Sequence, residues 1–263
     1  MNNNHLKQIA AWFDRFVATF VVPTPEEQRN YDLKIEHTAR VRTIMERLAA
    51  TLNLSPDEWS LASIIAICHD VGRFPQYRKY GTFNDATSVN HAALAVQTLK
   101  VEGILDAFDE GARSLILQAV ALHNVFTLPI DLDPAVKRFA RLIRDADKLD
   151  IWRVLIEYCA LPLKERASAV IWELPDTGFC SNQAIEEVIN GRMINRTLLA
   201  TADDFKLLQI SWAYDLNFDE SYRILAEKGY IETLAALLPD QPGCGEAVAS
   251  VSDYIENRIR NLS

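Results

Sequence analysis

Four of the five histidines lie on the apolar faces of segments with helical periodicity, namely His37, His69, His91 and His123. Two aspartates share this placement, because Asp70 directly follows His69 and Asp145 lies between Leu142 and Leu149. One buried imidazole is usually an ordinary core residue. Six inward ionisable groups, however, would cost several kcal/mol each unless a common counter-ion pairs with them. We therefore expect these six side chains to bind a divalent metal.

The ligand types indicate which ions would suit such a site. Imidazole nitrogens and carboxylate oxygens without a thiolate suit Mn, Fe, Co, Ni, Zn or Mg better than a structural zinc site. Six ligands exceed what one ion needs beside water and substrate, so one or two ions are expected. Asp70 has two oxygens and could join two ions about 3.5–4 Å apart, a spacing that can clamp a phosphoryl group.

A cluster of cations follows the His69-Asp70 doublet. Residues 73–81 are predicted to form a loop, which carries three cations and three aromatic residues in an acidic chain. Such charge could stabilise a phosphoryl group, or it could belong to a solvated surface. Arg73 lies three residues after Asp70 and is expected near the metals, while Lys148 could reach the same cleft or pair with acidic neighbours. The candidate substrate-binding residues are Arg73, Arg78, Lys79 and Tyr80.

The segments around these residues carry helix signals and few strand signals. Ser55, followed by proline and then two acidic residues, is typical of a capped helix start. Only nine glycines are present, which leaves few tight turns and favours an all-α fold. His91 is expected in the first turn of its helix, with Ser88 or Asp85 as cap. Helices are predicted over residues 5–20, 25–52, 56–70, 86–100, 109–124, 134–158, 181–190, 202–215, 219–229, 230–238 and 244–261.

Composition and charge limit the kinds of partner and the cellular compartment that we expect. The net charge of −9 disfavours nucleic acid and anionic membranes as partners. The four cysteines are far apart, which gives no disulfide framework and agrees with a cytoplasmic protein. No targeting or membrane-spanning segment is recognised. We expect one helical domain over residues 1–263, with a joint within residues 161–182.

Three segments together resemble the HD-domain superfamily of metal-dependent phosphohydrolases. They are residues 36–41 around His37, residues 68–74 around the doublet, and the acidic segment 144–150. They reproduce the family order of His, then His-Asp, then Asp. The resemblance covers about residues 25–155 and implies an all-helical HD bundle, on which a C-terminal extension of about residues 160–263 packs.

The resemblance also implies a ligand set. The first metal would be held by His37, His69, Asp70 and Asp145, and the extra pair of two-metal members would be His91 and His123. Asp147 competes with Asp145 for the last ligand position. Asp145 is preferred because it aligns with the family ligand and lies on the apolar row. Asp147 and Asp150 are expected to hydrogen-bond nearby or face solvent.

The expected function is hydrolysis of a phosphate ester or anhydride in a nucleotide or other small phosphorylated metabolite, through a metal-activated water. Asp70 would orient that water or accept its proton, and Arg73 and Lys148 would stabilise charge on the transferred group. Two alternatives stay open. One is a di-iron oxygenase of the same superfamily, and the other is a non-catalytic ligand-binding HD domain. The oligomeric state is left open.

Overall fold

The computed structural model describes residues 3–22, 24–162 and 174–260. Contacts divide the chain into two compact units, the first built from residues 1–150 and the second from residues 151–161 and 172–263. The single domain over residues 1–263 stays a prediction. Of the expected joint at 161–182, residues 163–173 lie outside the described residues.

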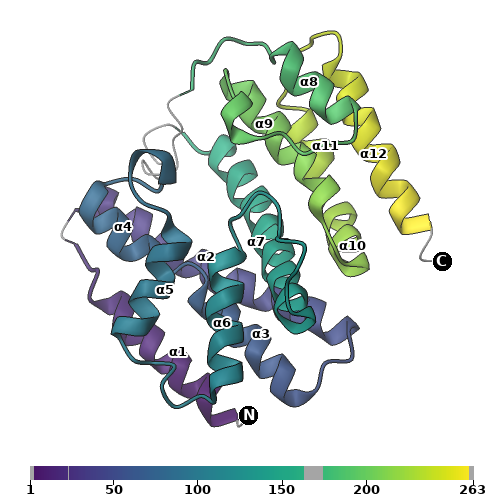
Figure 1. Cartoon of the computed structure of the whole chain (residues 1–263). Coiled ribbons are helices and arrows are strands. Elements are labelled where there is room, and N and C mark those ends of the chain that lie inside the picture. Colours follow the sequence, from purple (N-terminus) through teal and green to yellow (C-terminus); the bar gives the residue numbers. More distant parts are fainter. Residues whose placement is uncertain (1–2, 23, 163–173, 261–263) are drawn as a thin grey trace. The chain divides into compact units, whose positions relative to one another are not determined.

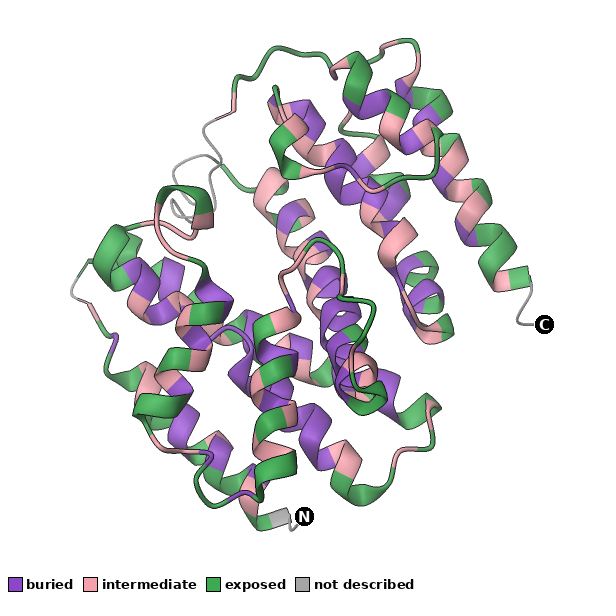
Figure 2. Cartoon of the chain, in the orientation of Figure 1, coloured by how far each residue is buried: buried purple, intermediate pink, exposed green. Residues whose placement is uncertain are grey.

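The first unit is a bundle of helices whose buried faces turn towards one another (Figures 1 and 2). Helix α3 is buried from Ser60 to Cys68 and packs against α1, α2 and α6. Helix α5 packs against α4 and α6, and α4 also contacts α2. The elements are α1 (Asn3–Ala18), α2 (Pro25–Thr51), α3 (Pro56–Cys68), α4 (Arg73–Tyr80), the short η1 (Asp85–Thr87), α5 (His91–Val101), α6 (Glu110–Leu122) and the first part of α7 (Pro134–Ala160).

The second unit is also helical throughout its described residues. Helix α12 packs along α8 and contacts α9, α10 and α11. Trp152, on the part of α7 that belongs to this unit, is fully buried and donates from its indole nitrogen to the Gln209 carbonyl at 3.0 Å. The elements are α8 (Asn182–Ile189), η4 (Arg196–Leu198), α9 (Ala202–Ser211), η5 (Trp212–Asp215), α10 (Asp219–Lys228), α11 (Tyr230–Ala235) and α12 (Cys244–Arg260).

The all-α prediction is confirmed, since every helix or strand assignment in the described residues is helical. The predicted cap at Ser55 is confirmed as well: its hydroxyl accepts from the Glu58 amide, and the Glu58 carboxylate accepts from the Ser55 amide. No helix among the described residues is long and apolar enough to cross a membrane.

The loop predicted at residues 73–81 is wrong, because residues 73–80 form helix α4. Pro75 is the third helical residue, where its missing amide hydrogen breaks no internal hydrogen bond. Gly81 ends the helix with φ of 66°, a backbone conformation that glycine adopts without strain. The cations of this segment are therefore distributed around a helix.

The start predicted for helix α5 is also wrong. The helix begins at His91 and not near residue 86, and its cap is Asn90, whose side chain accepts from the Ala93 amide. Neither of the predicted caps, Ser88 and Asp85, is the N-cap residue. Asp85 Oδ2 instead accepts from the His91 ring at 2.6 Å, and it also accepts from the His91 amide at 3.4 Å. His91 lies in the first turn, as predicted.

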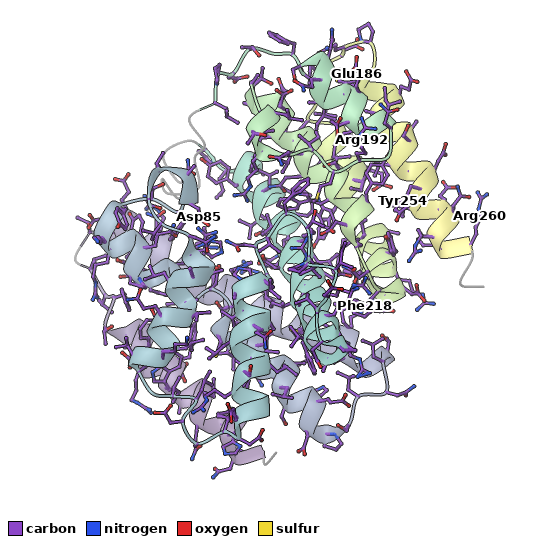
Figure 3. The ribbon with its side chains drawn as sticks, in the orientation of Figure 1. Asp85, Glu186, Arg192, Phe218, Tyr254 and Arg260 are labelled. Atoms are coloured by element: carbon purple, nitrogen blue, oxygen red, sulfur yellow. The ribbon has the colours of Figure 1, made fainter. Side chains whose placement is uncertain are left out.

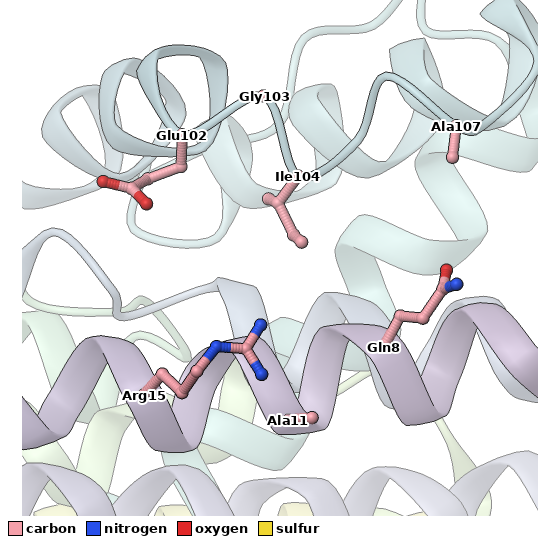
Figure 4. A pocket seen from close by; sticks show the side chains of 7 residues that line it. All are labelled: Gln8, Ala11, Arg15, Glu102, Gly103, Ile104 and Ala107. Atoms are coloured by element: carbon pink, nitrogen blue, oxygen red, sulfur yellow. The ribbon is translucent and has the colours of Figure 1, made fainter.

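A shallow groove of about 410 Å³ lies between α1 and the connection from α5 to α6 (Figure 4). Gln8, Ala11 and Arg15 line one side, and residues 102–104 and Ala107 line the other. None of the metal-ligand candidates lines this groove.

Candidate metal centre

Four elements of the first unit bring the predicted ligands together. Helix α2 carries His37, the turn after α3 carries His69 and Asp70, α5 begins with His91, and His123 directly follows α6. All five residues are at most 4% exposed. Their inward placement agrees with the expectation from the sequence, and groups this deeply buried require charged or hydrogen-bonding partners.

Asp70 lies between two pairs of imidazoles. Its Oδ2 is 3.6 Å from His37 Nε2 and 3.8 Å from His69 Nε2. Its Oδ1 is 3.5 Å from His91 Nε2 and 3.9 Å from His123 Nε2. Each pair therefore forms with Asp70 a group whose ligand atoms are close enough to hold one ion. One carboxylate oxygen faces each group, which is the arrangement of a carboxylate shared by two cations.

In the first pair, His37 and His69, each ring donates a hydrogen bond from Nδ1 to the surrounding protein, and its Nε2 points towards Asp70. His37 Nδ1 lies 2.7 Å from Asp150 Oδ2, and His69 Nδ1 lies 2.7 Å from the Ala66 carbonyl oxygen. Carboxylate and carbonyl oxygens only accept, so the proton sits on Nδ1 in both neutral rings. The two Nε2 atoms, 3.4 Å apart, then both present lone pairs.

The second pair follows the same pattern. His91 Nδ1 lies 2.6 Å from Asp85 Oδ2, and His123 Nδ1 lies 2.7 Å from the Val120 carbonyl oxygen. The two Nε2 atoms are only 2.9 Å apart. Neutral rings oriented in this way cannot hydrogen-bond to each other, and their lone pairs repel. A divalent cation would accept the lone pairs of both Nε2 atoms and remove their repulsion. The hydrogen bonds from Nδ1 hold each ring in the orientation that such binding needs.

Helix α7 adds a carboxylate to the first group. Asp147 Oδ1 lies 3.1 Å from His37 Nε2 and 3.8 Å from His69 Nε2. Asp145, two residues earlier, is fully buried and leaves the helix about 200° away from Asp147. The geometry therefore favours Asp147, the reverse of the preference from the sequence, and Asp145 as a ligand stays a prediction. Asp150 hydrogen-bonds nearby, as expected.

The preference for Asp145 rested on its alignment with the family ligand and on its place in the apolar row, whereas Asp147 lies off this row. The apolar stripe of α7 marks the centre of the core. Asp147 lies at the edge of the core, where its side chain is still 16% exposed, whereas the imidazoles and Asp70 are at most 4% exposed. A residue at the edge of the core, such as Asp147, lies beside the apolar face of α7 and not within it.

Two cations contact Asp70, one at each oxygen. Lys34 Nζ lies 2.7 Å from Oδ2, and Arg73 Nε lies 3.4 Å from Oδ1. Arg73 points towards the centre, as predicted. Its Nη1 is held by Asp85 Oδ1 at 3.0 Å, whereas its buried Nε has no hydrogen-bond partner. An unsatisfied buried donor beside the ligand groups fits a site that receives a further polar group.

The pKa values of three of the four rings, His69, His91 and His123, agree with neutral imidazoles. Burial lowers the pKa of His91 to about 3 and that of His123 to about 4, and it also lowers the pKa of His69. Burial and the nearby Lys34 lower the pKa of His37, but the hydrogen bonds that its ring donates to Asp147 and Asp150 outweigh them, so the pKa is raised overall.

Asp70 stays ionised despite its burial. Burial alone would raise the pKa of its carboxyl group, but Lys34, His69 and Arg73 together hold that pKa well below its usual range. A carboxylate that keeps its charge in the interior is a strong ligand for a cation.

The other predicted substrate-binding residues have contacts away from Asp70. Arg78 donates to the Thr19 carbonyl, and its guanidinium carbon lies 3.9 Å from the centre of the Phe20 ring. Lys79 lies 5.0 Å from the ring centre of Tyr80, which is 39% exposed. A role of these three in substrate binding stays a prediction. Lys148 is buried on α7, beside Asp147 in the sequence, and its catalytic role is likewise untested.

Two polar partners of the centre were missed by sequence reasoning. Lys34 lies one helical turn before His37, a spacing that could have revealed it. Asp85, labelled in Figure 3, was considered only as a helix cap, yet it receives hydrogen bonds from His91, Arg73 and the Asn124 amide. Nothing in the local sequence pattern distinguishes this role from capping.

Comparison with known proteins agrees with this geometry. Residues 35–152 match the family described as HD domain. This segment belongs to the HD-domain superfamily. The HD domain contains every ligand candidate, from His37 to Asp147. No curated protein and no solved structure matches the chain.

HD domains are mostly metal-dependent hydrolases, and proteins with this domain bind divalent metals. In this HD domain the His69-Asp70 doublet lies where the two ligand groups meet, with His69 in one group and Asp70 in both.

Proposed function

We propose that the HD domain binds two divalent cations and hydrolyses a phosphate ester or anhydride in a nucleotide or another small phosphorylated metabolite. One observation carries the proposal: each oxygen of Asp70 faces its own pair of imidazoles, and all four rings direct Nε2 inward. The donor chemistry of both groups fits Mn, Fe, Co, Ni, Zn or Mg.

The ligands divide between two positions. His37, His69, Asp70 and Asp147 would hold one ion, and Asp70, His91 and His123 would hold the other. When bound, the ions supply a water of lowered pKa and stabilise negative charge on phosphoryl oxygens.

The chain's own residues orient this chemistry. Asp70 carries its charge between the two groups and would orient an attacking water there. Arg73 is fixed at Nη1 by Asp85, Gln76 and the Phe83 carbonyl, which leaves Nε directed at the centre. A guanidinium fixed in this way stabilises charge on the transferred group without a cost of reorganisation.

Elemental analysis of protein purified without chelators tests the proposal, followed by a screen of phosphorylated metabolites with the metal found. We expect about two ions per chain, and about one in His91→Gln or His123→Gln. Asp70→Ala should lose both metal and phosphate release. His5→Gln is the matched control, since His5 lies on α1 and contacts the Phe108 ring, with the ring centres 4.6 Å apart.

Turnover at the full rate without bound metal would contradict the proposal. Oxygen uptake by the iron-loaded protein, with no phosphate released from any substrate, would replace it with oxygenase chemistry. Tight retention of a small molecule without turnover would instead identify a binding domain.

A further inference from the structure

Lys34 forms an ion pair with Asp70 at the centre. It is on α2, three residues before His37 and therefore on the same helix face. Its ammonium lies 2.7 Å from Asp70 Oδ2, the oxygen that faces His37 and His69. The Lys34 side chain is 14% exposed, whereas that of Asp70 is 3% exposed. Lys34 thus connects the buried ligands to solvent.

A second cation accompanies it. Lys34 Nζ lies 5.4 Å and the Arg73 guanidinium carbon 5.8 Å from the centre of the Phe83 ring. The two cations contact different oxygens of Asp70. Both cations therefore lie close to Asp70 and to the Phe83 ring, in a chain whose net charge is −9.

The two cations differ in how firmly they are held. Arg73 is tied by hydrogen bonds to Gln76, Asp85 and the Phe83 carbonyl. Among the residues that the structure describes, Lys34 has one ion-pair partner, Asp70, and it has a flexible stem of four carbons. A divalent cation bound by His37 and Asp70 would repel the nearby ammonium and compete with it for the same carboxylate oxygen. Of the two cations, Lys34 is therefore the one that can leave its ion pair with Asp70 and bind another anion.

We propose that Lys34 binds the anionic phosphoryl group of the substrate, and that its pairing with Asp70 keeps it at the centre until metal is bound. This inference rests on the proposed function and adds a substrate-binding residue to it. The chemistry it requires is a phosphate group with negatively charged oxygens, as in a phosphate monoester or in inorganic phosphate.

Calorimetric titration of inorganic phosphate into the metal-loaded full-length protein tests the proposal, with the metal content of each sample measured in parallel. We expect Lys34→Met to keep its metal and to bind phosphate at least about tenfold more weakly. Lys34→Arg should retain part of the affinity, because it keeps the charge. Lys100→Met, a change at an exposed lysine on α5, is the matched control and should bind as the unchanged protein does.

The inference is overturned if Lys34→Met binds phosphate within twofold of the unchanged protein, or if the metal-loaded unchanged protein binds no phosphate. Loss of metal in both Lys34→Met and Lys34→Arg also overturns it, because Lys34 would then only support Asp70. Should Lys34→Met fail to fold, Lys34→Gln takes its place in the comparison. The metabolite screen decides the proposed function separately, since phosphate binding requires no turnover.

Discussion

Each imidazole of the centre uses one nitrogen for the protein and keeps the other for a ligand. Asp85 and Asp150 accept from ring Nδ1 atoms on opposite sides of the centre, His91 on one side and His37 on the other. Because these hydrogen bonds fix the tautomer and the ring orientation, the two carboxylates would influence metal binding at the proposed centre without being ligands themselves.

Asp85→Asn should weaken the second ion selectively. The amide can donate to His91 Nδ1 and so favour the wrong tautomer, which should lower the affinity of that position about 10–100-fold. The first ion should bind as before. Metal titration with two resolved binding steps measures this, and Asp106→Asn, at an exposed carboxylate, is the control. Equal weakening of both steps would show that Asp85 supports the fold and not His91.

Asp147 and Asp145 can be separated by paired substitutions. Asp147→Asn should lower the affinity for the first ion and change stability little, since the Asp147 side chain is partly exposed. Asp145→Asn should lower the melting temperature and leave metal affinity intact, because Asp145 is fully buried and faces away from Asp147. A folded Asp145→Asn protein that has lost its metal would restore the preference drawn from the sequence.

At the scale of elements, most helices follow from local signals, and the two errors have local causes. Proline and glycine within residues 73–81 favoured a loop, but Pro75 falls in the first turn of a helix, where it is tolerated. The boundary of α5 was missed because Asp85 resembles a cap, whereas Asn90 is the cap. Both Asp85 and Asn90 have side chains that can cap a helix. The sequence does not show that the His91 ring occupies Asp85 and that Asn90 is the cap.

Some residues of the centre could be predicted from the sequence and others could not. The histidines and Asp70 were predictable because they lie on apolar helix faces, where an ionisable group is conspicuous. Asp85 was not, since a polar residue in a connection is ordinary, and Lys34 was signalled only by its spacing of one helical turn before His37. The side chains that support a buried site are revealed only by the packing of helices α2, α4 and α5.

The close approach of α4 to α5 depends on Gly72. A Cβ at this position would lie 2.2 Å from the His91 carbonyl oxygen and 2.5 Å from the Ala95 amide nitrogen. Gly72→Ala should therefore destabilise the protein by about 1–3 kcal/mol and displace His91. Urea denaturation measures the loss, and the second ion should bind more weakly.

Gly245→Ala is the matched control, because a Cβ there meets nothing within 4 Å and the residue lies in α12. It should leave stability unchanged or raise it by up to about 1 kcal/mol. Equal effects of the two substitutions would refute the argument from close approach.

At the scale of the whole molecule, the buried centre makes stability depend on pH when metal is absent. The pKa of His91 is lowered to about 3 and that of His123 to about 4, in both cases through burial. In the unfolded chain both rings take up protons near pH 6.5. Between about pH 6.5 and 4 the unfolded chain therefore binds up to two more protons than the folded chain at these positions.

Stability must then fall as the pH falls, by about 1.4 kcal/mol per pH unit for each such proton. The raised pKa of His37 acts in the opposite direction only above pH 6.5, where the folded ring keeps its proton longer. The lowered pKa of Asp70 adds to the loss only below about pH 4. Urea midpoints of chelator-treated protein at pH 7, 6 and 5 should decrease in that order. The double substitution His91→Gln and His123→Gln should flatten the decrease, and a midpoint that rises towards pH 5 would show that the folded chain takes up the protons first.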